Sequence, residues 1–167
     1  MGIVESWILA WTRLDGRDGH ETGRQLLARL YHAETGADCP MILTTPRGKP
    51  YFQDSPLHFS ITHTKNHAFC VLSPHPVGID AEEQDRNINL RLADKILSPP
   101  EKARFENVPD KRAALLRLWV LKEAAAKCSG EGLRGYPAHT DFSPEDHRIT
   151  EIDGCYVAVI KENDHAF

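Results

Sequence analysis

The first half of the chain carries the hydrophobic patterns of several strands and one helix. Residues 3–12 are apolar and rich in β-branched and aromatic side chains, which predicts a strand. Across residues 21–35 apolar side chains recur at helical spacing, and the run stops at Gly36, a residue type that often follows a helix. Residues 57–62 alternate strictly between apolar and polar, as a half-buried strand does. Shorter strands are expected at residues 41–45, 68–72 and 77–82.

The next part of the chain is predicted to be helical. Residues 87–97 have apolar side chains at the spacing of a short helix. Ser98-Pro99-Pro100-Glu101 combines an N-cap serine, an early proline and a glutamate at the third helical position, which predicts the start of another helix. The longest predicted helix covers residues 110–128 and ends at Gly130.

The last patterned segment is a hairpin. Residues 148–152 and 155–161 are predicted strands, and Asp153-Gly154 between them suits the positive φ angles of a type I′ turn. This order of strands and helices predicts an α+β fold.

The composition is that of an ordinary globular protein and excludes several classes. The 167 residues are 41% hydrophobic and 26% charged, which rules out long disorder and collagen-like or coiled-coil architecture. With 24 acidic and 20 basic residues the formal net charge is −4, so bulk electrostatic binding to nucleic acid is not expected. Apolar runs such as residues 7–11 and 156–160 are too short to span a membrane.

The cysteines and the first residues predict a cytoplasmic protein. Residues 1–5 have neither the basic nor the apolar region of a signal peptide. The four cysteines form no C-x-x-C pair, so free thiols in a reducing cytosol are expected. His63 and His67 flank a predicted turn and not a helix, so a zinc site with helical H-x-x-x-H spacing is not expected.

The predicted strand at residues 77–82 places two carboxylates side by side. Alternation directs Asp80 and Glu82 to the face opposite the apolar residues of this strand. Two like charges at that distance repel each other, and Mg²⁺ resolves the conflict because it prefers carboxylate oxygens. The alternative is a strand end that is simply hydrated.

A helical wheel of residues 112–127 directs a second charged pair inward. Leu115, Trp119 and Ala126 mark the centre of the apolar face, and Glu123 and Lys127 fall within its arc. Inward charges are costly unless each has a partner, and a metal for Glu123 and a phosphate for Lys127 would serve. The alternative is a partly exposed pair on the helix surface.

Two further segments could meet an anion. Thr62-His63-Thr64 ends the alternating strand, and hydroxyl and imidazole groups there suit phosphate oxygens. In Gly48-Lys49-Pro50 the glycine permits close backbone approach and the lysine can pair with an anion. An ordinary turn is the alternative for both segments.

The sequence resembles the 4′-phosphopantetheinyl transferase superfamily through four segments in the family's order. That family is marked by a GKP turn, a strand ending in Ser-His-Ser, a G-I-D-x-E strand and a W-x-x-K-E-x-x-x-K helix. The matching segments are GKP (48–50), FSITHT (59–64), VGIDAE (77–82) and WVLKEAAAKCSGEGL (119–133). Each motif is weak alone, but four in series are specific. The GKP turn and the N-terminal strand and helix resemble the longer, pseudo-dimeric branch more than the single-half branch that forms trimers.

The resemblance implies both a fold and a reaction. It implies two similar small α/β halves, residues 1–76 and 77–167, packed with pseudo-twofold symmetry around the active site. The first half would hold the nucleotide side of coenzyme A, and the second the metal and catalytic residues. The implied reaction is attack by a serine of an apo acyl or peptidyl carrier protein on the β-phosphorus of coenzyme A, with Mg²⁺, releasing 3′,5′-ADP.

The resemblance also implies roles for individual residues. The carboxylates that would hold Mg²⁺ are Asp80, Glu82 and Glu123. Glu123 would also take the proton of the carrier serine, and Glu82 could contribute. The residues that would contact coenzyme A are Lys49, Thr62, His63 and Lys127, with His63 and Lys127 on the pyrophosphate.

Some features depart from the family pattern. Thr62 and Thr64 stand where serines are usual, although both keep the hydroxyl. The chain is also shorter than most two-half members. No basic residue aligns cleanly with the family's contact to the 3′-phosphate, and the candidates are Arg17, Arg24, Arg29 and Arg47.

The carrier protein requires a basic surface on this acidic chain, because carriers are generally acidic around the modified serine. The candidates are Arg86, Arg91 and Lys95, next to or on the helix predicted after the carboxylate strand. A hydrated helix face is the alternative.

Other functions for such a chain are a non-catalytic relative that binds coenzyme A or a carrier protein, and an interaction module. A degenerate relative should lack a metal carboxylate or the pyrophosphate lysine, whereas Asp80, Glu82, Glu123 and Lys127 are all present. The sequence therefore favours the transferase.

Overall fold

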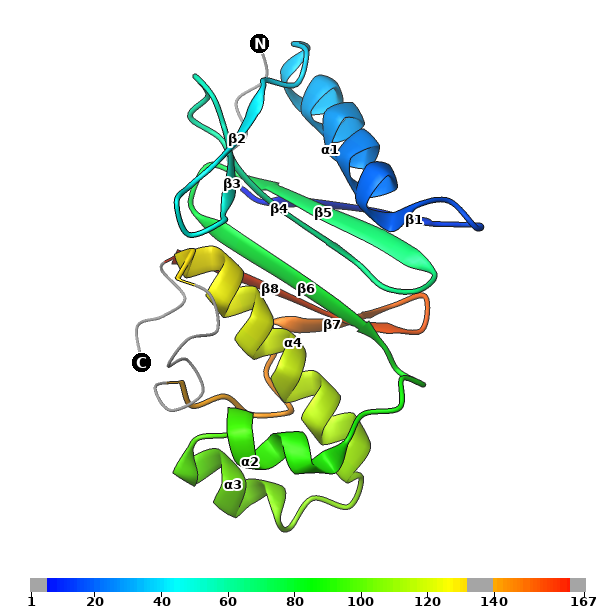
Figure 1. The fold of residues 1–167 in the computed structure, drawn as a ribbon, viewed down its shortest axis with the longest axis vertical. Helices are drawn as coiled ribbons and strands as arrows, with labels where there is room; N and C mark the ends of the chain where they lie inside the picture. Colours follow the sequence, from blue (N-terminus) through cyan, green and yellow to red (C-terminus); the bar gives the residue numbers. More distant parts are fainter. Residues whose placement is uncertain (1–5, 132–139, 163–167) are drawn as a thin grey trace.

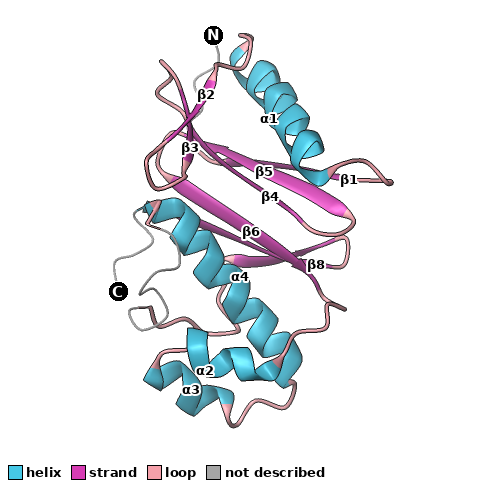
Figure 2. Cartoon of the chain, in the orientation of Figure 1, coloured by secondary structure: helices cyan, strands magenta, loops and turns pink. Residues whose placement is uncertain are grey.

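The computed structural model describes residues 6–131 and 140–162 and has the mixed α+β architecture that the sequence predicts (Figures 1 and 2). Its elements in chain order are β1 (Ile8–Arg13), α1 (Gly19–Thr35), β2 (Ile42–Thr44), β3 (Pro50–Phe52), β4 (His58–His63), β5 (His67–Ser73), β6 (Val77–Glu83), the 3₁₀ turn η1 (Leu90–Leu92), α2 (Ala93–Ile96), α3 (Pro99–Phe105), α4 (Lys111–Ser129), β7 (Ile149–Ile152) and β8 (Cys155–Lys161). Among the helices of these two stretches, none has both the length and the apolar character needed to cross a lipid bilayer.

The strands form two three-stranded antiparallel sheets and one two-stranded ribbon. The first sheet has the order β1-β5-β4, the second β6-β8-β7, and the ribbon pairs β2 with β3. Strands β4 and β6 lie side by side where the two sheets meet (Figure 1). At this junction the backbone N–H of Ile79 donates to Ser60 Oγ at 3.1 Å.

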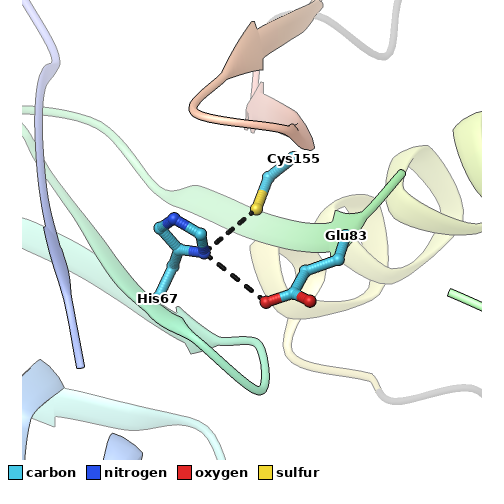
Figure 3. Close-up of side chains that lie close together, drawn as sticks. All are labelled: His67, Glu83 and Cys155. Carbon is cyan, nitrogen blue, oxygen red and sulfur yellow. Dashed lines mark hydrogen bonds and ion pairs between the residues drawn. The ribbon is translucent and has the colours of Figure 1, made fainter. Parts of the chain in front are cut away.

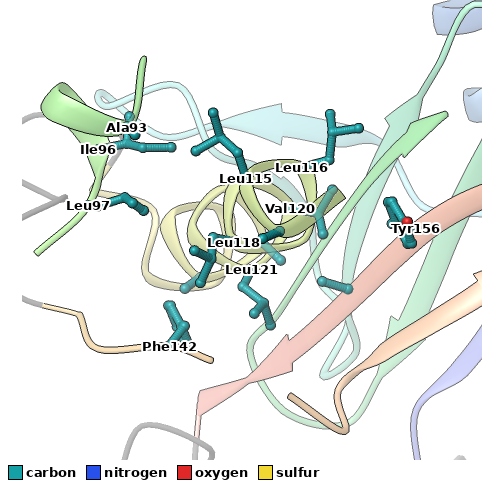
Figure 4. Packing of buried hydrophobic residues seen from close by; sticks show 14 of the residues in the cluster. Ala93, Ile96, Leu97, Leu115, Leu116, Leu118, Val120, Leu121, Phe142 and Tyr156 are labelled. Carbon is teal, nitrogen blue, oxygen red and sulfur yellow. The ribbon is translucent and has the colours of Figure 1, made fainter. Parts of the chain in front are cut away.

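Each sheet has one long helix on its outer face, and apolar side chains fill the space between the sheets. Helix α1 packs on the first sheet and α4 on the second (Figure 1). The layer between the sheets consists of Phe69, Val71, Val77, Ile79, Ala81, Cys155, Val157 and Val159. Around α4, leucines such as Leu115, Leu118 and Leu121 pack with side chains of α2, the 140s segment and β8 (Figure 4). These layers fix the position of α4 relative to β6.

Local capping explains where the main helices begin and end. Helix α1 starts where Asp18 accepts from the N–H of Glu21 and ends at Gly36, which has a φ of 73°. The side chain of Asp110 caps α4 in the same way, and Gly130 ends it with a φ of 72°. Ser98 caps α3 as its sequence predicts.

The structure corrects several predicted boundaries. The first strand begins at Ile8 and not at residue 3, and residues 3–5 lie outside the described residues. The helix predicted at 87–97 is reduced to η1 and α2, because Asn89 caps a 3₁₀ turn through the N–H of Arg91. Strand β3 was not predicted. The terminal hairpin is confirmed, with φ angles of 46° at Asp153 and 79° at Gly154.

Candidate active site

Strand β6 presents its polar and apolar residues on opposite faces, as its alternation predicts. Val77, Ile79 and Ala81 are buried in the layer between the sheets. Asp80 and Glu82 therefore face α4. This confirms the predicted orientation of the two carboxylates.

Helix α4 lies on β6 at unusually close range because residue 78 is glycine. A Cβ at Gly78 would lie 1.9 Å from the carbonyl oxygen of Ala124 and 2.5 Å from the backbone nitrogen of Cys128. No other residue type fits there without moving the helix. The close contact brings Glu123 and Lys127 of α4 toward Asp80 of β6.

Asp80 is the buried centre of the candidate site. Its Oδ1 accepts hydrogen bonds from Thr62 Oγ1 at 3.1 Å and from Lys127 Nζ at 2.9 Å. Its Oδ2 is buried and has no hydrogen-bond partner among the described residues. Burial raises the pKa of Asp80 above its usual value, while Lys127 and Thr62 act in the opposite direction.

Glu82 and Glu123 add two more carboxylates to the same region. Burial raises the pKa of Glu82, nearby Asp80 adds to this effect, and the paired Arg86 opposes it. For Glu123, burial and then the charge of Asp80 are the largest causes that raise its pKa to about 7, with Glu82 adding and Lys127 opposing. The three carboxylates thus act on one another electrostatically.

The sequence prediction placed Lys127 inward, and the structure specifies its partners. Lys127 Nζ donates to Asp80 Oδ1 and, at 3.1 Å, to the carbonyl oxygen of Ile79. Its carboxylate partner in the structure is therefore on β6 and not Glu123 one turn earlier on α4. Its side chain remains 34% exposed, so the ammonium also reaches solvent.

The carboxylate oxygens of Asp80, Glu82 and Glu123 are not all within 4.8 Å of one another. Among the described residues, a different trio reaches that spacing: His67, Glu83 and Cys155. The donor set nevertheless fits a hard divalent cation such as Mg²⁺, which prefers carboxylate oxygens. Within residues 6–131 and 140–162, Asp80 Oδ2 has no hydrogen-bond partner, and the basic ion-pair partners of the three carboxylates are Lys127 and Arg86.

A pocket of about 330 Å³ opens beside this cluster, between α1, the β2–β3 turn, β4 and α4. Its lining includes every predicted coenzyme A contact: Lys49, Thr62, His63 and Lys127. Glu123 also lines it, whereas Asp80 and Glu82 do not. The strongly basic lining matches an anionic ligand.

Additional basic residues reach this pocket from the first half of the chain. Of the four arginines considered for the 3′-phosphate, Arg24 and Arg47 line it. Arg29 does not, and Arg17 donates to the carbonyl oxygens of Arg13 and Leu14. His20, at the start of α1, also lines the pocket and was not predicted, because no sequence motif marks it.

Lys49 of the GKP turn contacts the C-terminal end of α4. Its Nζ donates to the carbonyl oxygen of Cys128 at 2.6 Å, where a cation is favoured by the helix dipole. Burial lowers the pKa of Lys49. Gly130 makes room for this lysine, because a Cβ there would lie 2.9 Å from Lys49 Cδ.

The remaining motif residues that the structure describes and the predicted carrier-binding residues lie outside the pocket. Lys122, within the helix motif, is fully buried and pairs with Glu101 at 2.7 Å, which sequence spacing did not indicate. Arg91 and Lys95 are exposed, whereas Arg86 pairs with Glu82. The last two motif residues, 132 and 133, lie outside the described residues.

Comparison with known proteins places this site in a family context. The sequence profile of the 4′-phosphopantetheinyl transferase superfamily matches residues 76–162. The chain is 30% identical over 134 residues to a 4′-phosphopantetheinyl transferase of Bacillus pumilus, psf-1, covering 77% of this chain and 57% of that protein. It is 34% identical over 92 residues to the transferase gsp of Aneurinibacillus migulanus, covering 52% and 36%, and 34% identical over 95 residues to HetI of a Nostoc species, covering 52% and 40%. The chain thus spans 36% to 57% of the length of these curated relatives.

Proposed function

Because the chain belongs to the 4′-phosphopantetheinyl transferase superfamily, we propose that it transfers the 4′-phosphopantetheine group of coenzyme A to a serine of an apo carrier protein and releases 3′,5′-ADP. The observation that carries the proposal is the carboxylate cluster of Asp80, Glu82 and Glu123 beside a basic pocket. A pyrophosphate ligand requires both features, cationic side chains for its oxygens and carboxylates for an accompanying metal ion.

Asp80, Glu82 and Glu123 are the residues that would hold Mg²⁺. The bound ion would neutralise negative charge on the pyrophosphate and on the oxygens around the reacting phosphorus. Support for this assignment comes from the unpartnered Asp80 Oδ2 and from the surplus of carboxylates over basic partners.

The pocket would bind coenzyme A through its basic wall. Lys127 and His63 would contact the pyrophosphate, and Lys49 and Thr62 the nucleotide end. An ammonium has three donors, so Lys127 can reach a phosphate oxygen while it stays bonded to Asp80. Arg24 and Arg47 are the proposed contacts of the 3′-phosphate, because they are the basic candidates that line the pocket.

Glu123 is the proposed general base. The carrier serine Oγ attacks the β-phosphorus, the bond to the 3′,5′-ADP oxygen breaks, and the serine proton passes to the Glu123 carboxylate. Without a bound cation, burial and the neighbouring carboxylates raise the pKa of Glu123 to about 7, so this carboxylate accepts a proton more readily than an ordinary glutamate. Glu82 could contribute, although Arg86 pairs with it.

The proposal extends to the symmetry and location of the protein. Residues 1–76 and 77–167 would be two halves related by pseudo-twofold symmetry, each with a three-stranded sheet and a long helix. A cytoplasmic location is supported by the four cysteines, all of which are free thiols. The carrier would approach the exposed Arg91 and Lys95, with Arg86 nearest the carboxylates.

The test is incubation of the protein with coenzyme A, Mg²⁺ and a panel of apo carrier proteins, followed by mass spectrometry of each carrier. We expect one phosphopantetheine group to be added. Asp80→Ala and Glu123→Ala should each lower the rate by about a thousandfold or more. Glu106→Ala, at the exposed end of α3, is the matched control and should leave the rate unchanged.

Two results would contradict the proposal. Near-normal transfer by Asp80→Ala or Glu123→Ala, with circular dichroism showing a folded protein, would refute the metal and base assignments. Coenzyme A binding without transfer to any carrier would favour a non-catalytic relative.

A further inference from the structure

A second polar cluster lies on the opposite face of β6 from the candidate active site. Glu82 faces α4, whereas Glu83 points to the junction between the two sheets, where it meets His67 of β5 and Cys155 of β8 (Figure 3). Glu83 and Cys155 are directly paired residues of adjacent strands. His67 and Cys155 are buried, and the side chain of Glu83 is 16% exposed.

The two distances from His67 to the other members of this trio match those between ligands of one small metal ion. His67 Nδ1 lies 3.4 Å from Cys155 Sγ and 3.5 Å from Glu83 Oε1, and all three atoms are within 4.8 Å of one another. Tetrahedral zinc with ordinary bond lengths separates such nitrogen, sulfur and oxygen ligands by about 3.3–3.6 Å. The arrangement therefore needs little movement to enclose an ion.

The other nitrogen of His67 has the partner that metal-binding histidines usually have. Nε2 lies 2.8 Å from Asp153 Oδ2, and Arg13 holds Asp153 with two bonds of 2.7 Å. Because Asp153 accepts a hydrogen bond, we assign the ring proton of His67 to Nε2. Nδ1 then carries a lone pair, and this lone pair is directed at Cys155 and Glu83. A carboxylate behind a histidine orients the ring and increases its basicity toward a metal.

Glu83 is held in place independently of the histidine. Its Oε1 accepts from Thr64 Oγ1 at 3.0 Å and from the N–H of Asn66 at 2.9 Å. Its Oε2 accepts from the amide of Asn66 at 3.0 Å. The carboxylate is thus fixed beside the imidazole and the thiol, so the site is preorganised.

We propose that His67 Nδ1, Glu83 Oε1 and Cys155 Sγ form a binding site for a Zn²⁺-type transition-metal ion that links the two sheets. The mixed nitrogen, sulfur and oxygen donors suit zinc and do not suit Mg²⁺, so this site differs from the carboxylate cluster in its chemistry. Three protein ligands leave one tetrahedral position for water. The inference does not depend on the proposed transferase activity.

Of the three ligands, His67 lines a pocket of about 290 Å³ together with Asn66 and Asp153, whereas Glu83 and Cys155 do not line it. Binding forms a zinc–sulfur bond and releases the thiol proton to solvent, with no change of oxidation state.

The test is titration of the full-length protein with Zn²⁺ by calorimetry, together with Co²⁺ as a spectroscopic probe. We expect one Zn²⁺ per chain, a higher melting temperature, and a sulfur-to-cobalt charge-transfer band. Cys155→Ser should weaken zinc binding by at least about tenfold and remove that band, and Asp153→Asn should weaken binding by about 10- to 100-fold. If Cys155→Ser does not fold, Glu83→Gln at the strand end tests the affinity instead: it should weaken zinc binding while the sulfur-to-cobalt band persists at saturating Co²⁺.

Two controls separate this site from others. Cys39→Ser removes a partly exposed thiol elsewhere, and Asp80→Asn alters the carboxylate cluster, so both should leave zinc affinity unchanged. The proposal is overturned if the wild-type protein binds no zinc at micromolar concentrations, if the cobalt complex has no sulfur band, or if Asp80→Asn abolishes binding while Cys155→Ser does not. The trio would then be a hydrogen-bonded junction in which His67 lies between the carboxylates of Glu83 and Asp153.

Discussion

Lys122 and Glu123 are neighbours on α4, but they face very different surroundings. Lys122 is 1% exposed and pairs with Glu101, whose side chain is fully buried. Glu123 lies in the wall of the basic pocket, near Asp80 and Glu82. One residue therefore belongs to a structural ion pair and the next to a candidate reaction centre.

The ion pair of Lys122 and Glu101 and the carboxylate cluster around Asp80 differ in charge balance more than in burial. Each leaves one buried carboxylate oxygen without a hydrogen-bond partner in the described residues, Glu101 Oε2 and Asp80 Oδ2. An unpartnered oxygen alone thus does not mark a metal site. Among the described residues, Lys122 pairs with Glu101, and the nearby Asp141 has its own ion pair with Arg104. In the same part of the chain, the three carboxylates of Asp80, Glu82 and Glu123 have two ion-pair partners, Lys127 and Arg86. The excess negative charge distinguishes the candidate site.

The largest effect on stability should come from breaking the structural pair. Lys122→Met leaves Glu101 buried without its cation, and the free energy of unfolding should fall by about 3–5 kcal/mol. The measurement is urea unfolding followed by circular dichroism. The double variant Lys122→Met/Glu101→Leu should recover most of the loss, because it buries no unpaired charge. Equal stability of the single and double variants would show that the two residues are not coupled.

Gly78→Ala should disturb the contact between β6 and α4 that holds the candidate active site together. The new Cβ would meet the backbone of α4, so the helix must shift and the free energy of unfolding should fall by about 2–3 kcal/mol. Transfer activity should fall as well, because Lys127 would move away from Asp80. Gly23→Ala is the matched control. Its Cβ would meet a single side-chain atom, Ile61 Cγ2 at 2.6 Å, and not the backbone of another element, so a smaller loss is expected. Equal losses would contradict the close-contact explanation.

The sequence predicted the elements whose determinants are local. The capped helices and the Asp153–Gly154 turn depend on neighbouring residues, and the structure confirms them. The alternation in β6 also predicted which way Asp80 points. The helix at 87–97 was overestimated because apolar spacing gave no weight to the Asn89 cap.

Contacts between distant segments could not be predicted in this way. The partner of Lys127 lies 47 residues away on β6, and that of Lys122 lies 21 residues away on α3. His67 meets Cys155 across 88 residues, so the spacing of histidines carried no information about that cluster. Such pairs arise from the packing of whole elements and leave no local pattern.

The pH dependence of stability should distinguish Glu123 from ordinary carboxylates. Its pKa is about 7 in the folded protein and near 4.5 in the unfolded chain, so the folded state retains the proton over this interval. Stability is therefore lost as the pH rises from 4.5 to 7. Glu123→Gln should remove this loss and stabilise the protein by about 1–2 kcal/mol more at about pH 8 than at about pH 5, after allowance for solvent screening.

Urea unfolding at the two pH values, with a chelator present, measures this difference. Glu106→Gln replaces an exposed carboxylate and should show little change between the two conditions. A pH-independent effect of Glu123→Gln would mean that the carboxylate cluster does not raise the pKa of Glu123.

The smallest expected effect is on carrier binding, and it tests whether the exposed charges near α2 have a function. Helix α2 packs against α4 within the same apolar cluster, and two basic side chains, Arg91 of η1 and Lys95 of α2, are exposed beside it. If an acidic carrier docks on them, the double variant Arg91→Glu/Lys95→Glu should raise the apparent KM for the carrier by roughly three- to tenfold. The KM for coenzyme A should not change, and added salt should reduce the difference between variant and wild type.

Arg29→Glu reverses an exposed charge on α1 outside the pocket and serves as the control. Equal changes in both KM values, or an equal effect of Arg29→Glu, would assign these charges to hydration alone.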